Sequence, residues 1–120
     1  MKNIIIIDSN GQALAAMTQS EAETYLGDYL ERNLQANMKQ CMNDITSNKG
    51  KATGDYEYDS HPALHASSGN MQKSVSIFYY DDEDMHYIIA MGEHKTATSY
   101  KLSFYGQPAG AFKYKATIEL

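Results

Sequence analysis

The sequence predicts an α+β fold for a single domain spanning residues 1–120: an N-terminal strand, one long or broken helix, and then a four-stranded antiparallel meander packed on the helix. Three observations lead to this prediction. Four isoleucines stand near the start, a capping sequence introduces a stretch with helical periodicity, and the second half is rich in Tyr, Phe, Ile and Val with a period of two. With 120 residues, 42% of them hydrophobic, the chain is large enough to bury one core.

The isoleucine run, Ile4 to Ile7, reads as a buried strand. It ends at Asp8, and Asn10 and Gly11 follow, two residue types that tolerate positive φ and favour a turn. The run is too short for a membrane span or for the apolar region of a signal peptide, so no membrane anchor is predicted.

The helix is predicted to begin at Thr18, because Glu21 three residues later completes a capping box, and to end near Ser47. Gly27 is its weak point, since glycine costs about 1 kcal/mol relative to alanine inside a helix, and a kink or a break into two helices is expected there. Apolar residues recur along it with helical spacing at Ala22, Tyr25, Leu26, Tyr29, Leu30, Leu34, Met38, Cys41, Met42 and Ile45.

Residues 46–72 are rich in Ser, Thr, Asn, Gly and Lys, and they predict an irregular connection with one short strand at Tyr56 to Tyr58. Strands are predicted afterwards, at 73–81, 85–93, 99–105 and 111–120. The acidic segment 81–84 and the Gly/Pro segment 106–110 are short enough to be hairpin turns.

Charge is unevenly distributed along the chain. Residues 1–93 hold six Lys or Arg against fourteen Asp or Glu, a formal charge of -8, whereas residues 94–120 hold four Lys against Glu119, a charge of +3. Alternation in the last two predicted strands puts Ser99, Lys101, Lys113 and Lys115 on one face. Lysines among hydroxyls suit a phosphate backbone, and the alternative is an ordinary solvated sheet face.

A candidate catalytic segment lies just before and within the third of these strands. RNA cleavage without a metal needs a base for the 2′-OH proton, a cation for the phosphorane charge and an acid for the leaving oxygen. His94 can serve as base or acid, Lys95 and Lys101 as cations, Tyr100 as proton donor, and Thr98 and Ser99 as hydrogen-bonding groups to the substrate. The alternative for His94 is a surface histidine at a loop edge.

The segment SVSIFYYDDEDMHYIIAMGEHKTATSYKL, residues 74–102, resembles the central strands of RelE/ParE-like toxins. The shared pattern is a strand ending in aromatics, an acidic turn, an apolar strand and a Gly-x-His-Lys sequence, here Gly92 to Lys95. The resemblance implies the fold of the wider group of barnase-like, colicin-like and RelE-like RNase toxins. Those toxins are usually basic and arginine-rich, whereas this chain is acidic and has one arginine, Arg32. Lysines 95, 101, 113 or 115 would therefore take the arginine roles, on free RNA instead of the ribosome.

Other polar residues have competing interpretations. His61 and His65 lie in the predicted connection, and a folded-over loop would let one of them pair with His94 as acid and base; the alternative is an ordinary polar loop. His86 is expected to be a satisfied histidine of the core or sheet. Cys41, the one cysteine, is expected to pack in the core.

No metal and no cofactor are predicted. The acidic positions Asp55, Glu57 and Asp59 and the 81–84 turn lack the spacing of a calcium loop and are interpreted as solvated surface. Glycine-rich phosphate loops and the G-x-S-x-G hydrolase elbow do not occur in the sequence.

Two functions follow from the sequence. The first is a metal-independent RNase toxin, acting in the cytoplasm on RNA such as tRNA, delivered alone or as the C-terminal part of a larger effector, and neutralised by a cognate immunity or antitoxin protein. The second is a small acidic binding module, such as an immunity or inhibitor protein or a cystatin-like ligand-binding domain, which the net charge of -5 favours. Lysines that line a cleft with His94 would favour the first, and lysines paired with Asp or Glu the second.

Overall fold

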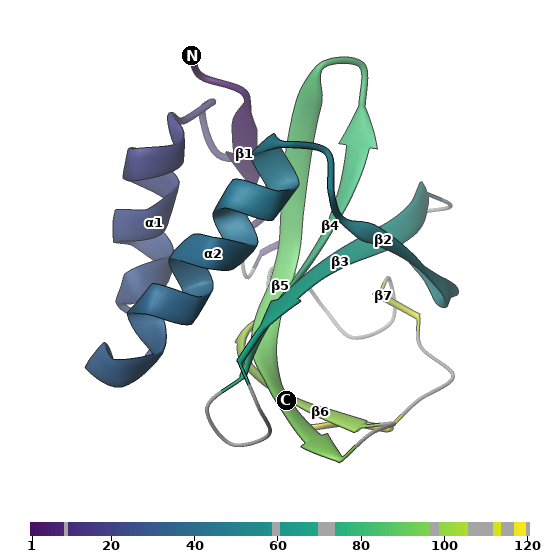
Figure 1. The fold of residues 1–120 in the computed structure, drawn as a ribbon. Coiled ribbons are helices and arrows are strands. Elements are labelled where there is room, and N and C mark those ends of the chain that lie inside the picture. Colours follow the sequence, from purple (N-terminus) through teal and green to yellow (C-terminus); the bar gives the residue numbers. More distant parts are fainter. Residues whose placement is uncertain are drawn as a thin grey trace.

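The computed structural model describes the backbone of residues 1–8, 10–58, 61–69, 74–96, 99–105, 112–113 and 117–119. Side chains are described within these ranges as far as residue 93, except at 53–56. In this part of the chain, two α-helices and one 3-10 helix lie against a sheet of eight strands (Figure 1). The α+β class is confirmed, but the sheet has more strands than the four predicted.

The isoleucine run forms β1 (Ile4–Ile6), a strand in the middle of the fold. It pairs in parallel with β5 (Met85–Thr96), so that Ile4 lies opposite His86 and Ile6 opposite Ile88. Isolated bridges from Ile4 to Met17 and from Ile7 to Ala13 cover its other edge. The predicted strand is therefore correct, and it joins the start of the chain to its C-terminal half.

The predicted helix is two helices, α1 (Gln19–Gly27) and α2 (Gln35–Thr46), joined through the 3-10 helix η1 (Arg32–Leu34). The capping box is present: the Glu21 amide donates to the Thr18 hydroxyl at 3.1 Å, and the Thr18 amide donates to the Glu21 carboxylate at 2.9 Å. The break comes directly after Gly27, the weak point in the sequence. None of the described helices is long and apolar enough to cross a membrane.

Residues 46–72 were expected to be an irregular connection with one short strand at Tyr56 to Tyr58. The short strand is confirmed as the end of a longer one, but the irregular connection is wrong. Two eight-residue strands, β2 (Lys51–Tyr58) and β3 (His61–Ser68), form there as an antiparallel pair. Strand formation depends on neighbours as much as on intrinsic propensity, and β3 lies between β2 and the apolar β4 (Val75–Asp82). Its buried positions hold the small residues Ala63 and Ala66.

The antiparallel order β3, β4, β5, β6 (Ser99–Tyr105) confirms a meander in this half of the chain. The β4–β5 turn consists of Glu83 and Asp84, and Glu83 adopts a φ of 56°. On β5 the register shifts at Ile89, an extra residue opposite Phe78 and Tyr79. This bulge interrupts the alternation expected from the sequence, and it places Ala90 on the face opposite to that of Ile88.

The last predicted strand, 111–120, is instead two short strands, β7 (Phe112–Lys113) and β8 (Thr117–Glu119). They do not form a hairpin with β6: β7 pairs with β2, and β8 pairs with β6 in parallel. The strand order is β7-β2-β3-β4-β5-β6-β8. Lys113 and Thr117 are four residues apart, at most about 14 Å, so the two ends of this order must curl towards each other.

The sheet consequently has two buried faces. Both helices pack on one of them, where Leu26, Met42 and Ile45 meet β1, β4 and β5 (Figure 1). The other, which we call the second face, has a cluster of its own that includes no helix residue. Its buried members are Ile7, Tyr58, Ala63, Phe78, Tyr80, Ile89 and Ala90. The curl of the sheet turns this second face inward.

Candidate functional site

A row of rings crosses the second face. Tyr80 of β4 stacks on Tyr87 of β5, with centroids 4.7 Å apart and planes 3° apart. Towards β3 it stacks on His61, with centroids at 4.3 Å and planes 10° apart, and Tyr58 of β2 lies at 5.5 Å. We call Tyr58, His61, Tyr80 and Tyr87 the aromatic row. Tyr58 and Tyr80 are 7% and 8% exposed, while His61 and Tyr87 are half-buried, so the accessible members of the row are His61 and Tyr87.

The row was not predicted, although the sequence contains a signal for part of it. A two-residue turn at Glu83 and Asp84 makes Tyr80 the partner of Tyr87 across the hairpin. The prediction failed on the other side because β3 and its pairing with β2 were not expected, so His61 had no assigned place in the sheet.

His65 belongs to the same face as the row. Its ring stacks on Phe78 at 6.3 Å, and its Nδ1 lies 3.1 Å from the carbonyl oxygen of Lys51. Further along the same two strands, the hydroxyls of Ser67 and Ser76 are 2.7 Å apart, and Ser76 is fully buried. The two histidines expected in a loop are therefore held in a strand.

The structure does not bring His61 or His65 beside His94. His65 is in register with Phe78, and Phe78 with Ala90, so the backbone of His94 lies four residues, about 13 Å, further along and two strands away. His61 lies four residues from His65 in the opposite direction along β3. A histidine pair formed by a folded-over loop does not occur, because residues 61–68 are hydrogen-bonded into the sheet.

His94 has a different neighbour. In the β5–β6 ladder it is the Cα partner of Tyr100, and Thr96 is the partner of Ser99. Directly opposed positions of an antiparallel pair lie about 4.5–5.5 Å apart. Two of the residues that the sequence analysis selected for proton transfer thus occupy adjoining backbone positions. Lys95 is in β5, and residues 98 and 115 lie outside the described residues.

The lysines of the predicted basic face are in register with glutamates. Lys101 is the Cα partner of Glu93 on one side and of Glu119 on the other. Lys113 lies opposite Glu57, because β7 pairs with β2 and not with β6. Lys101 and Lys113 therefore do not share one hairpin, as the sequence had predicted, and Lys115 lies outside the described residues.

Three further expectations concern structural residues. His86 is 7% exposed, its Nδ1 lies 2.6 Å from an oxygen of Asp81, and the edge of Tyr79 covers it, so it is a satisfied buried histidine as predicted. Cys41 is fully buried, its thiol donates to the carbonyl of Val75 at 3.3 Å, and burial raises its pKa to about 12. Among the described residues, no group of three His, Cys, Asp or Glu is placed to hold a metal.

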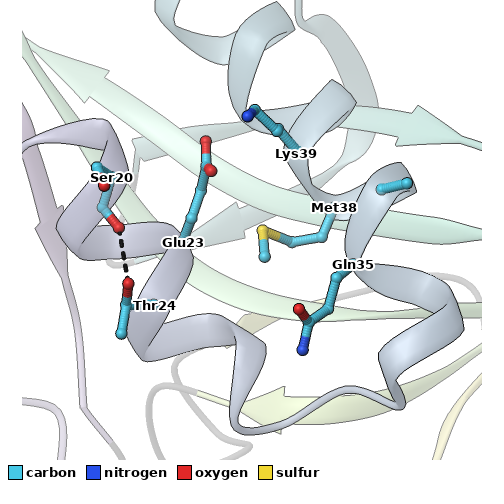
Figure 2. Close-up of a pocket in the computed structure, with 7 residues that line it drawn as sticks. Ser20, Glu23, Thr24, Gln35, Met38 and Lys39 are labelled. Carbon is cyan, nitrogen blue, oxygen red and sulfur yellow. Dashed lines mark hydrogen bonds between the residues drawn. The ribbon is translucent and has the colours of Figure 1, made fainter.

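A cavity of about 370 Å³ opens between α1 and α2, on the outer side of the helical layer. Figure 2 shows Ser20, Glu23 and Thr24 on one wall and Gln35, Met38 and Lys39 on the other. Of the seven lining residues, Ala36 and Met38 are apolar, with Met38 3% exposed, and the other five are polar. The cavity was not predicted, because the expected break at Gly27 does not by itself say how the two helical segments pack against each other.

Comparisons of the chain with protein-family models, with curated proteins and with solved structures find no match. The likeness to RelE/ParE-like toxins therefore stays a prediction from the sequence, and the function is argued from the site alone.

Proposed function

We propose that the protein is a metal-independent RNase of the toxin type. The observation that carries this proposal is the register of β5 and β6, in which His94 lies opposite Tyr100. An acid and a base at adjoining positions are what cleavage of RNA through its own 2′-OH requires. Lys95 follows His94 on the strand and supplies a cation in the same region.

In the proposed reaction His94 accepts the proton of the ribose 2′-OH while the 2′-oxygen attacks the adjacent phosphorus. Lys95, at the register shift between His94 and Thr96, stabilises the charge that develops on the phosphorane oxygens, and Lys101 binds the phosphate backbone of the substrate. The bond from phosphorus to the 5′-oxygen then breaks, and Tyr100 protonates this leaving oxygen. The products are a 2′,3′-cyclic phosphate and a free 5′-OH, with Thr98 and Ser99 as hydrogen-bonding groups to the substrate.

The aromatic row supports the choice of RNA as substrate. Bases stack on aromatic side chains with little dependence on sequence, and the half-buried rings of His61 and Tyr87 are the accessible members of the row. Tyr87 and His94 are seven residues apart on β5, a separation of about 23 Å. A single strand of several nucleotides would span this distance. The proposal includes a cognate immunity or antitoxin protein that neutralises the RNase.

The test is incubation of the purified protein with total RNA in the presence of a chelator. We expect cleavage products with cyclic phosphate ends for the wild type and a loss of at least about a hundredfold in rate for His94→Ala, since acid–base catalysis contributes about 10²–10⁴. Tyr100→Phe should also slow the reaction. Intact RNA with the wild type, together with normal growth of cells that express it, would refute the proposal.

Matched controls separate catalysis from folding. His65→Gln changes a histidine of the same sheet that lies away from His94, and Tyr29→Phe changes a tyrosine that is 44% exposed on the helical side. Both should keep the wild-type rate. Equal losses for His65→Gln and His94→Ala would contradict the assignment of His94.

A second function, an acidic binding module of the immunity or inhibitor type, is favoured by the register of the lysines. Opposed Lys and Glu positions in a sheet form favourable pairs, so Lys101 and Lys113 would be neutralised by Glu93, Glu119 and Glu57. The exposed turn at 81–84 would then be available to a basic partner. This proposal predicts that Lys101→Gln leaves every activity unchanged, whereas the RNase proposal predicts slower cleavage.

A further inference from the structure

The cavity between α1 and α2 is bordered by two opposite charges that do not pair with each other. Glu23 contributes a half-buried carboxylate from α1, and Lys39 contributes an exposed ammonium group from α2. In the part of the chain that the structure describes, no ion pair joins them. Both nevertheless border the same space of about 370 Å³ (Figure 2).

The carboxylate of Glu23 is held in place and only half satisfied. Its Oε2 accepts a hydrogen bond from the Gln19 amide at 2.8 Å, and within the described residues Oε1 accepts none. The same Gln19 amide donates to Asn43 Oδ1 at 2.6 Å, and the hydroxyl of Thr46 donates to Gln19 Oε1 at 2.9 Å. This network ties α1 to α2, so the carboxylate is oriented before any ligand arrives.

Unlike the carboxylate of Glu23, the ammonium group of Lys39 is not held by hydrogen bonds from the described residues. It forms no hydrogen bond or ion pair with any residue in the described ranges, and it lines the cavity together with the buried Met38. On α2 its neighbours at four residues in each direction are Gln35 and Asn43, which carry no charge. The cavity thus presents a fixed anion, a free cation and an apolar floor.

We propose that this cavity binds a small zwitterion of the α-amino acid class. The ligand's ammonium group would pair with Glu23, its carboxylate with Lys39, and its side chain would lie against Met38. A simple anion would meet Glu23 and a simple cation would meet Lys39, so each would gain one favourable contact and one repulsion. The volume is at the lower end of the range of about 300–1,000 Å³ for small-molecule sites. The inference does not depend on RNA cleavage.

The first arm of the test varies the ligand. Amide resonances of the ¹⁵N-labelled protein are followed during titration with L-methionine and L-glutamine, and with N-acetyl-L-methionine and L-methioninamide, which each lack one charge. We expect saturable shifts at residues 20–24 and 35–39 with the free amino acids, and binding weaker by about tenfold or more for either derivative. Derivatives that bind as well as L-methionine, or no saturable shift with either free amino acid, would overturn the proposal.

The second arm varies the protein. Glu23→Gln and Lys39→Gln should each weaken binding of L-methionine by about tenfold or more. The matched controls Glu31→Gln and Lys49→Gln remove the same charges at exposed positions outside the cavity, and they should bind as the wild type does. Circular dichroism of all four variants checks that they fold. Unchanged affinity in both cavity variants would show that the charges do not form the site.

Discussion

At the scale of single residues, close packing limits which side chains a position can hold. Tyr79 is 1% exposed, and burial, together with the charges of Asp81 and Asp44, raises its pKa to about 12, although a backbone hydrogen bond from Gly50 opposes the rise. A side chain at position 50 would overlap the Tyr79 hydroxyl and ring. In the sequence, Gly50 resembles an ordinary turn glycine. In the structure, a glycine is required there because a larger side chain would overlap Tyr79, which is 29 residues later in the chain.

The substitution Gly50→Ala tests this contact. We expect a loss of about 1–3 kcal/mol in the free energy of unfolding, because the added methyl group forces Tyr79 or the backbone to move. Urea denaturation followed by circular dichroism measures the loss. The control is Gly27→Ala, where the nearest atom is 3.5 Å away on the flexible Gln35 side chain. If both variants are equally stable, the contact does not constrain position 50.

At the scale of elements, local signals define the helices well. The capping box at Thr18 and the glycine at 27 mark both ends of α1, because each acts within a few residues along the chain. Strands β2 and β3 have no such local signal. Their sequence is rich in small and polar residues, and they become strands only because β4 and β7 provide hydrogen-bonding edges.

The capping box makes the stability of α1 depend on pH. The hydrogen bonds to Thr18, with a smaller contribution from the charge of Lys2, lower the pKa of Glu21 below its usual 4.5. A lowered pKa means that the charged carboxylate stabilises the folded state above pH 4.5, and that this contribution is lost as the pH falls through the folded-state pKa.

The variant Glu21→Gln should therefore lose less stability than the wild type between pH 7 and pH 3, since glutamine keeps a capping oxygen without a titrating charge. Urea denaturation at a series of pH values measures the difference. Glu31→Gln is the control, because Glu31 makes no capping hydrogen bond at η1. A Glu21→Gln curve parallel to that of the wild type would contradict the role of the capping box.

At the scale of the whole molecule, β1 holds the two halves together. It pairs with β5 across 82 positions of sequence, and Ile4 and Ile6 enter the same core as α1 and α2. The sheet curls so that its second face is also buried. In a four-stranded meander this face would be open to solvent. The helical layer, the central strand and the C-terminal strands are therefore expected to unfold together.

Ile6→Ala tests this cooperativity. The side chain is fully buried, so we expect a loss of about 2–5 kcal/mol. The loss should appear equally in helix circular dichroism and in tyrosine fluorescence, which reports on the sheet in a chain without tryptophan. Ile5→Ala, on the same strand but half-buried, should cost clearly less. Separate transitions for the two signals would show that the halves fold independently.

The sequence by itself determined the α+β class, the buried first strand, the cap of α1, the weak point at Gly27 and the hairpin at Glu83. Each of these depends on interactions between residues close together in the chain or on a regular period. The roles of His86 and Cys41 were also predictable, because isolated polar residues within apolar patterns are usually buried with a partner.

Only the tertiary structure decided which segments lie side by side. It placed His94 opposite Tyr100, Lys101 between two glutamates and Lys113 beside β2, and it assembled the aromatic row from four strands. It also set how α1 and α2 pack against each other and so formed the cavity between them. The physical reason is that pairing of distant strands and helices depends on the packing of the whole core, which no local pattern encodes.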